Sequence, residues 1–280
     1  MSEYQHLELE SHRDVTVVWM NRPDVRNAFN ETMIAELSMV FRQIEGDDSV
    51  KAMVLAARGP SFCAGADLNW MKKMAGYSIE ENTEDALGLA SMLHSLYSMS
   101  KPTIARVHGH AFAGGMGLIS ACDIVVASFE AQFCLSEVKI GLIPATIGPY
   151  VVAAMGARAS HRYMLTGERF TAAEAYRIGL VHEITPPEKL DEKIDEILIH
   201  LVTGGSAAHA GTKSLIDLIA RSPLEQPLIE ETARRQIAIA PLQDVVATLD
   251  PPQGHFERDQ VDGFVGEVSR THVLPSASCM

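Results

Sequence analysis

Residues 110–123 read HAFAGGMGLISACD, and this stretch decides the fold. Its middle has no side chains at Gly114, Gly115 and Gly117, where an apolar segment could have kept them. A dinucleotide-binding fingerprint would need a third glycine where Ser120 stands. A phosphate loop of the G-x-x-x-x-G-K-S/T type is absent from the whole sequence. Neither nucleotide-binding motif therefore explains the glycines.

Two explanations of the glycines remain. They let a helix pack closely against a sheet, or a strand ends here and bare backbone N–H groups at a helix start point into a cleft. Such N–H groups have no partner within the helix and carry partial positive charge, so they bind an oxyanion. Residues 63–68 (CAGADL) follow another candidate strand and have the same small side chains. Two such loops can each donate one N–H to the same oxygen.

The rest of the chain consists of strand, loop and helix units. Short apolar runs without strict alternation predict strands at residues 7–10, 15–20, 51–57, 102–107 and 124–128. Apolar residues at helical spacing predict a helix that Asn30 caps and Gly46 ends, another near residues 86–97, and further helices at 147–155, 157–165, 172–178, 190–201 and 207–219. This order predicts an α/β fold with a largely parallel sheet. We expect a β/α core over residues 1–195, a helical region over 196–240 and an atypical, poorly ordered tail over 241–280.

Composition excludes several classes of function. The 280 residues carry a net charge of −13, with 36 acidic against 23 basic side chains, so no basic surface for a nucleic acid is expected. No apolar run approaches the roughly 20 residues that cross a membrane. The first ten residues, MSEYQHLELE, lack the basic and apolar segments of a secretory signal, which favours the cytoplasm. The four cysteines form no CxxC pair and are expected to be reduced thiols.

Several motifs, in matching order and spacing, resemble the enoyl-CoA hydratase/isomerase (crotonase) family. They are NRP (21–23), NAFN (27–30), F-x-AGADL (62–68), the Gly114-Gly115 loop that closes with ACD (121–123), and F-x-x-x-E-x-x-x-G-x-x-P (133–144). The likeness extends from about residue 5 to residue 219. It implies a crotonase-like spiral of β/α repeats with a helical C-terminal region, assembled as a homotrimer or a dimer of trimers.

The resemblance also implies a site. The amides of Ala66 and Gly114 would hold the oxygen of a CoA thioester, and Glu137 would transfer protons. Adding or removing a proton beside a thioester creates an enolate, which preorganised donors stabilise strongly. Contacts with substrate and CoA are expected at Arg22, Arg26, Ala28, Ala64, Asp67, Leu68, Trp70 and Gly117. No metal or redox cofactor is implied, because CoA arrives as part of the substrate.

One departure from the family pattern bears on the reaction. The commonest family arrangement uses two glutamates; Glu137 matches the second, and Gly117 stands at the place of the first. A single carboxylate can act first as base and then as acid. It suffices for a double-bond isomerase, and for a hydratase if substrate or another polar group positions the water.

The segments GADLNWMKKM (65–74), HAFAGGMGLISACD (110–123) and CLSEVKIGLIPATIGPYVV (134–152) are similar to bacterial methylglutaconyl-CoA and isohexenylglutaconyl-CoA hydratases. Their acyl groups carry a carboxylate of their own. We hypothesise that losing the first glutamate removes a like charge from the acyl pocket. Gly117→Glu should then weaken a dicarboxylic acyl-CoA more than crotonyl-CoA.

The sequence thus predicts an enoyl-CoA hydratase for a branched enoyl-CoA, including carboxylated ones such as methylglutaconyl-CoA. An isomerase that uses one glutamate and a non-catalytic acyl-CoA-binding protein are the alternatives. Individual residues also have simpler explanations. Asp67 can cap the following helix, Trp70 can belong to the core, and Arg22 and Arg26 can be solvated surface cations.

Two further constellations are weak. His108 and His110 form an H-x-H without a third ligand nearby in the sequence, so no metal site is expected. Ser120 with His108 and Asp123 lacks the G-x-S-x-G elbow of a nucleophilic serine, so no catalytic triad is expected.

Overall fold

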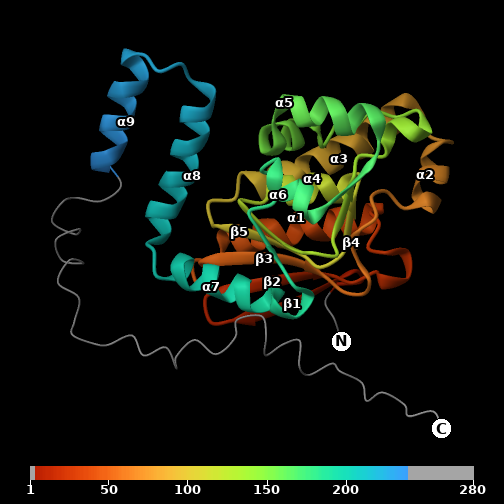
Figure 1. The fold of residues 1–280 in the computed structure, drawn as a ribbon, viewed down its shortest axis with the longest axis horizontal. Coiled ribbons are helices and arrows are strands. Elements are labelled where there is room, and N and C mark those ends of the chain that lie inside the picture. Colours follow the sequence, from red (N-terminus) through yellow and green to blue (C-terminus); the bar gives the residue numbers. More distant parts are fainter. Residues whose placement is uncertain (1–3, 239–280) are drawn as a thin grey trace, which may run out of the picture.

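Two β-sheets that share one hydrophobic core form the body of the protein (Figure 1). The structure is a computed structural model, and it describes residues 4–238. The larger sheet has six strands in the order β1-β2-β3-β5-β7-β10, namely β1 (Leu7–His12), β2 (Val15–Met20), β3 (Ala52–Ala57), β5 (Thr103–Val107), β7 (Ile124–Ser128) and β10 (Glu183–Thr185). The smaller has four in the order β4-β6-β8-β9, namely β4 (Ser61–Cys63), β6 (His110–Phe112), β8 (Gln132–Cys134) and β9 (Arg169–Thr171).

The larger sheet is parallel except for the hairpin of β1 and β2, as the sequence predicted. Successive residues of a strand point to opposite faces. In β3, Met53 and Leu55 therefore enter the main core, whereas Val54 enters a second core under α7 (Leu190–Val202). Burial on both faces explains why this strand shows no polar alternation.

Trp19 marks the second core and is almost fully buried. Its indole Nε1 donates to the Glu10 carboxylate at 2.7 Å. The guanidinium of Arg58 lies 3.8 Å from its ring centroid and that of Arg106 lies 5.5 Å away. Such cation–π contacts hold the two arginines over the sheet.

Helices cover both faces of the body. Those packed in the main core include α1 (Glu31–Gly46), α3 (Ile79–Tyr97), α4 (Gly114–Ala121) and α5 (Gly148–Thr166). Shorter elements are η1 (Pro23–Val25), α2 (Leu68–Met74), η2 (Glu137–Ile140), α6 (Ala172–Arg177) and η3 (Pro187–Lys189). The predicted ends of α1 are confirmed, because the Asn30 side chain accepts from the Met33 amide at 2.9 Å and the helix stops at Gly46. The predicted break between residues 155 and 157 is also confirmed, since Gly156 has φ 74° inside α5.

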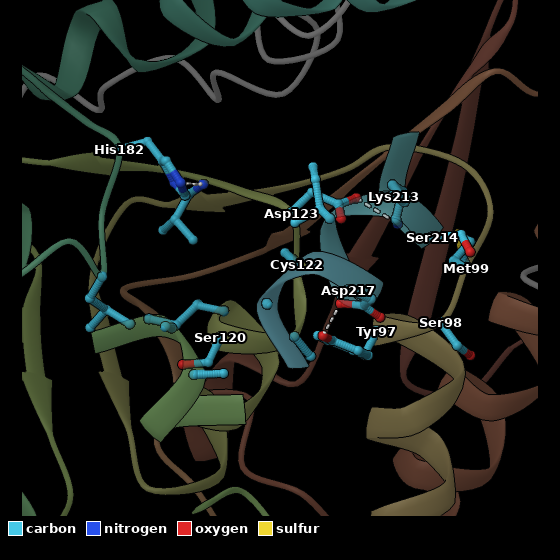
Figure 2. Close-up of a pocket in the computed structure, with 18 of the residues that line it drawn as sticks. Tyr97, Ser98, Met99, Ser120, Cys122, Asp123, His182, Lys213, Ser214 and Asp217 are labelled. Carbon is cyan, nitrogen blue, oxygen red and sulfur yellow. Dashed lines mark hydrogen bonds and ion pairs between the residues drawn. The ribbon is translucent and has the colours of Figure 1, made fainter. Parts of the chain in front are cut away.

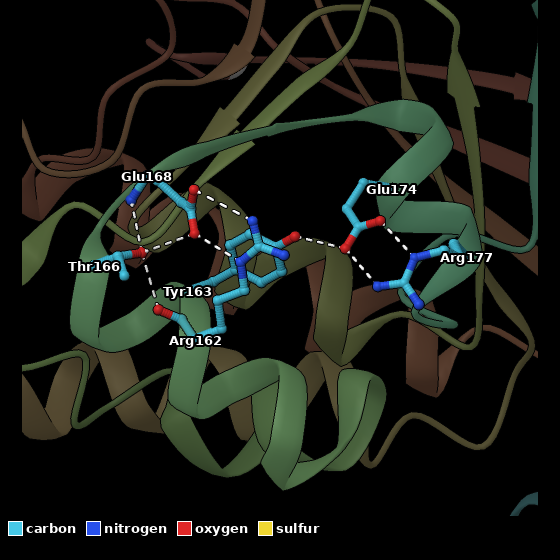
Figure 3. A network of polar contacts seen from close by, with 6 residues as sticks. All are labelled: Arg162, Tyr163, Thr166, Glu168, Glu174 and Arg177. Carbon is cyan, nitrogen blue, oxygen red and sulfur yellow. Dashed lines mark hydrogen bonds and ion pairs between the residues drawn. The ribbon is translucent and has the colours of Figure 1, made fainter.

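The smaller sheet was not predicted. Its strands have three residues each, too few to show a period in the sequence. A polar network fixes the corner that leads into β9 and out of it (Figure 3). Tyr163 donates from its hydroxyl to Glu174 at 2.6 Å, and Glu174 also pairs with Arg177. Arg162, near the end of α5, pairs with Glu168, the residue directly before β9.

Two final helices, α8 (Ser206–Arg221) and α9 (Gln226–Ala238), form a hairpin beside the body (Figure 1). Lys213 ties α8 to Asp123 at 2.7 Å, and Asp217 accepts from the Tyr97 hydroxyl at 2.5 Å. The domain boundary predicted at residue 195 falls inside α7, and the tail predicted over 241–280 lies outside the described residues. Within residues 4–238, no helix combines the length and the apolar character needed to cross a membrane.

Candidate active site

Three short parallel strands bring the predicted catalytic residues to one edge of the smaller sheet. β4 pairs in parallel with β6, and β6 with β8. Parallel strands end at the same edge, so the segments that follow β4, β6 and β8 leave the sheet together. These segments carry Ala66, Gly114 and Glu137.

The amide of Ala66 is turned away from its neighbouring strand. Phe29 and Ala66 form a parallel β-bridge, in which the Phe29 amide donates to the Gly65 carbonyl at 2.7 Å and the Asp67 amide donates to the Phe29 carbonyl at 2.8 Å. Successive N–H groups of an extended chain point in opposite directions. The Ala66 N–H therefore points away from Phe29, and no described residue accepts a hydrogen bond from it.

The amide of Gly114 opens α4 and also has no acceptor among residues 4–238. The residue before it, Ala113, has φ 46° and ψ −115°, a conformation that costs a non-glycine residue about 1–3 kcal/mol. A Cβ on Gly114 would lie 2.5 Å from Cε2 of Phe29, and a Cβ on Gly65 would lie 2.8 Å from Cβ of Ala113. The two loops therefore meet so closely that side chains are excluded there.

Glu137 begins η2, three residues after β8 ends. Its Oε2 is buried, and no described residue forms a hydrogen bond with it. Burial raises the pKa of this carboxyl above its usual value of 4.5, because the charged form loses hydration. A partly buried carboxyl with a raised pKa, and with one oxygen that has no described partner, is suited to take up and release a proton.

Gly117, at the place of the missing glutamate, is enclosed by apolar side chains. A Cβ built on it would lie 2.4 Å from Cγ2 and 2.9 Å from Cβ of Ile147, and 3.5 Å from Cδ1 of Leu93. Ile147 thus fills the space into which a side chain at position 117 would project. A glutamate at position 117, as the sequence-based test demands, therefore also needs a smaller residue at position 147.

The side chain of Arg22 is turned into the protein rather than free at the surface. Its guanidinium pairs with Asp67 at 2.9 Å and donates to the Ala28 carbonyl at 2.5 Å. Asp67 also accepts from the Asn69 amide at 2.8 Å, so it caps α2 as the simpler explanation predicted. Burial alone would raise the pKa of Asp67, but hydrogen bonds from Asn69 and Arg22 outweigh it and leave the pKa below its usual value.

The other predicted contacts differ in exposure. Ala28 and Trp70 are buried, Ala64 is partly buried, and Arg26 and Leu68 are exposed. The indole Nε1 of Trp70 has no hydrogen-bond partner among the described residues, although it is buried. Trp70 therefore belongs to the main core, and its indole donor is unsatisfied among the described residues. A role toward CoA or the acyl group stays a prediction for all of these residues.

Ser120, His108 and Asp123 do not form a triad. Asp123 accepts from Thr103 and pairs with Lys213, His108 bonds the Gly59 carbonyl, and the Ser120 hydroxyl has no described partner. Among residues 4–238, no three His, Cys, Asp or Glu side chains lie together so that they could hold a metal ion.

A cavity of about 630 Å³ lies at the other end of α4 from Gly114 (Figure 2). Ser120 and Asp123 line it, together with His182 and with Lys213 and Asp217 of α8. None of the predicted site residues is among the described residues that line it. The cavity is thus separate from the loops that carry Ala66 and Gly114.

Three residues of the site region were missed from the sequence. Phe29 bridges to Ala66 and lies under Gly114, Ala113 carries the unusual backbone conformation, and Ile147 fills the space beside Gly117. Phe29 lay inside a quoted motif and could have been singled out. Ile147 could not, because no pattern in one sequence links residues 30 positions apart.

The fold and these loops define a class of α/β protein in which bare main-chain N–H groups and one carboxyl group lie at an edge of a small sheet. The sequence model of a family described as enoyl-CoA hydratase/isomerase matches residues 10–238. A short-chain-enoyl-CoA hydratase from Clostridium acetobutylicum is 34% identical over 264 residues, covering 94% of this chain and 98% of that protein. A crotonyl-CoA hydratase from Syntrophomonas wolfei is 30% identical over 207 residues, covering 73% of this chain and 78% of that protein.

Solved structures agree. The crystal structure of an enoyl-CoA hydratase from Shewanella pealeana has a TM-score of 0.85 at 36% identity, covering 90% of this chain and 97% of that chain. The chain belongs to the enoyl-CoA hydratase/isomerase family. The predicted family and crotonase-like α/β fold are therefore confirmed.

Proposed function

We propose that the protein adds water to the double bond of an enoyl-CoA thioester, or removes it in the reverse direction. One observation carries the proposal: parallel strands deliver to the same edge two amides that have no acceptor among residues 4–238, and one carboxyl whose buried Oε2 has no described partner. The hydratase names of relatives with 30% identity or more support it. The catalytic residues are Ala66, Gly114 and Glu137.

The proposed reaction balances with one carboxylate. Glu137 removes a proton from water as the water oxygen bonds to the β-carbon, and the double-bond electrons move toward the thioester carbonyl. The Ala66 and Gly114 N–H groups stabilise the enolate oxygen. Glu137 then returns the same proton to the α-carbon, so that one water molecule has been added to one face of the double bond. No cofactor is required beyond the CoA of the substrate.

For the acyl group we propose a branched chain, including one with its own carboxylate such as methylglutaconyl-CoA. The support is the segment likeness over residues 65–74 and 134–152 and the absence of a carboxylate at position 117. A second carboxylate beside Glu137 would repel a charged acyl group. The surroundings of position 117 are instead apolar, with Ile147 and Leu93 nearest to it.

A double-bond isomerase is the second candidate. Gly117 favours it, because moving one proton between two carbons requires one carboxyl group and no positioned water. The two reactions differ in whether an oxygen atom from the solvent enters the product.

The test assays the purified protein with methylglutaconyl-CoA, isohexenylglutaconyl-CoA and crotonyl-CoA in water labelled with oxygen-18. We expect labelled 3-hydroxyacyl-CoA, with the highest kcat/KM for a branched substrate. An unlabelled isomer as the product would identify the isomerase. Tight binding without turnover of any substrate would identify a non-catalytic acyl-CoA-binding protein, and either result would overturn the proposal.

The charge hypothesis for the acyl pocket has its own test. Gly117→Glu combined with Ile147→Ala provides the second carboxylate with the space that the wild type lacks. We expect the pair to reduce kcat/KM for methylglutaconyl-CoA more than for crotonyl-CoA. Gly117→Ala with Ile147→Ala is the control for shape, and equal losses for both substrates would refute the hypothesis.

We also propose a homotrimer or dimer of trimers in the cytoplasm. None of the residues of α8 is fully buried in the single chain. Ile216 and Ile219 of this helix are about half exposed. Apolar side chains on an uncovered helix favour a partner. Sedimentation equilibrium of the full chain tests the assembly, and a monomer would exclude it.

A further inference from the structure

Arg22 spans the β-bridge that orients the Ala66 amide. The bridge joins Phe29 to Ala66, and the guanidinium of Arg22 contacts the residue before Phe29 and the residue after Ala66. These contacts are the Ala28 carbonyl at 2.5 Å and the Asp67 carboxylate at 2.9 Å. One side chain therefore fixes both strands of the bridge.

The backbone of Arg22 is fixed as well. Its amide donates to the Asn27 side chain at 2.7 Å, and its carbonyl accepts from the Asn27 amide at 2.9 Å. Asn27 is fully buried, and its side-chain amide donates to the Arg58 and Ser61 carbonyls, each at 2.8 Å. The guanidinium thus projects from a loop that is itself tied to the start of β4.

The second amide depends on the same bridge. Gly114 approaches Phe29 so closely that a Cβ on it would lie 2.5 Å from Cε2 of the ring. A shift of Phe29 relative to Ala66 would therefore move one amide and remove the surface on which the other rests. Preorganised donors act on a developing oxyanion only while their direction is held.

The ion pair is well placed for this task. The side chains of Arg22 and Asp67 are 15% and 7% exposed, so water screens their attraction little. The planar guanidinium can donate in two directions at once, to a carbonyl and to a carboxylate, which a lysine ammonium matches poorly. Asp67 in turn caps α2, so the contact also sets the start of that helix.

We propose, on the basis of the hydratase function above, that Arg22 is a positioning residue for the oxyanion site. It holds the Ala66 amide, and through Phe29 the Gly114 amide, in the direction that the thioester oxygen requires. It acts through other residues of the chain and does not contact the CoA phosphates.

The experiment compares Arg22→Ala with the wild type by two measurements. The first is steady-state hydration. The second is the absorption of a bound 2,4-dienoyl-CoA, which shifts to longer wavelength when hydrogen bonds polarise its carbonyl. We expect Arg22→Ala to lower kcat about 100-fold, the loss typical of one oxyanion donor, and to reduce the shift. KM for CoA thioesters should change little.

Three variants keep the test decisive. Asp67→Asn keeps a helix cap but removes the charge, so it should reproduce the effect on kcat and on the shift, and the double variant should add little more. Arg22→Lys should restore only part of the activity. Guanidinium ion at millimolar concentration should restore part of the lost kcat of Arg22→Ala.

The matched control is Arg106→Ala. Arg106 pairs with Asp191 at 2.5 Å and is 12% exposed, but it lies in the larger sheet. We expect it to lower the melting temperature and leave kcat and the absorption shift as they are. If Arg22→Ala instead raises KM for CoA esters but not for 3′-dephospho-CoA esters, Arg22 binds phosphate and the proposal is overturned.

Failure of the positioning role and failure of the hydratase function would give different results. An unchanged kcat and an unchanged shift in folded Arg22→Ala and Asp67→Asn would also overturn the positioning role. If the wild type does not hydrate any substrate, the proposed function fails first. The shift of the bound dienoyl-CoA then still decides whether Arg22 orients the amides.

Discussion

The two sheets differ in backbone strain and in the polar groups that they leave without hydrogen-bond partners. The central strands β2, β3 and β5 of the larger sheet are buried between apolar cores, and Glu8 and Glu10 of its edge strand β1 are both paired with Arg58. The smaller sheet ends in loops with positive φ at Gly65 and Ala113, and in a buried Glu137 oxygen without a described partner. Strained and unpaired groups are typical of functional sites, which is consistent with the binding proposed for these loops.

This difference predicts a separation of effects. Substitutions in the loops after β4, β6 and β8 should change turnover more than stability, and those in the larger sheet, or at the corner around β9, should change stability more than turnover. The following variants test that separation, beginning with the largest expected effect.

Glu137→Gln should have the largest effect on turnover. Removing the proton-transferring group is expected to lower kcat about 100- to 10,000-fold. Stability at pH 7 should be equal or higher, because a carboxyl whose pKa is raised in the folded state destabilises that state once it ionises. Hydration assays and thermal unfolding provide the two values. A kcat within a few-fold of the wild type would remove Glu137 from the mechanism.

Gly114→Ala should lower kcat by about 100-fold, since the added Cβ would lie 2.5 Å from Cε2 of the buried Phe29 ring and must displace the amide or the ring. Gly88→Ala in α3 is the matched control, because nothing lies within 4 Å of its added Cβ. The control should fold at least as stably as the wild type and keep its activity. Similar kinetics of both variants would contradict the close approach at Gly114.

Leu55→Ala should have the opposite effect, a loss of stability without a loss of turnover. Leu55 is fully buried in β3, and its truncation should cost about 2–5 kcal/mol of the free energy of unfolding. At temperatures where the variant remains folded, kcat should match that of the wild type. Chemical denaturation measures the first value. A large fall in kcat of the folded variant would show that the two sheets are not separable in this way.

The pH dependence of kcat/KM tests the environment of Glu137. As a base, the carboxyl must be ionised, and burial raises its pKa above 4.5. Activity should therefore be lost on acidification with a midpoint above that value, before an exposed glutamate would be protonated. A midpoint at or below 4.5, in the range where the protein is folded, would contradict the burial of Glu137.

The smallest effect is expected for Glu174→Gln at the corner of the smaller sheet. Hydrogen bonds from Arg177 and then Tyr163 lower the pKa of Glu174 from 4.5 to about 2 in the folded protein. Its stabilising contribution should therefore be complete above pH 4.5 and be lost as the pH falls toward 2. Melting temperatures of wild type and variant should differ modestly at pH 7 and converge on acidification. A constant difference would contradict the ionised network of Figure 3.

The sequence predicted the parts of the fold that follow local rules. Strand β3, the Asn30 cap of α1 and the break at Gly156 each depend on residues close together in the chain. The three-residue strands of the smaller sheet were missed, because pairing between distant segments and not a local period creates them.

The candidate site shows the same limit. The loops of Ala66 and Gly114 were predicted from their small residues and their likeness to a family. The inward turn of Arg22 depends on Asp67, 45 residues later, and the wall beside Gly117 depends on Ile147. A motif indicates which residues gather, whereas the direction of each side chain is set by neighbours that only the folded chain provides.

The two tryptophans of the chain lie in different apolar cores, and this gives the molecule two optical probes. Trp19 lies in the larger sheet, with its indole N–H bonded to Glu10 and two guanidinium groups over its ring. Trp70 follows the Ala66 loop, and its buried N–H has no described partner. Fluorescence from Trp19 should therefore report unfolding of the sheet, while that of Trp70 should respond to ligands. Phenylalanine at either position isolates the signal of the other.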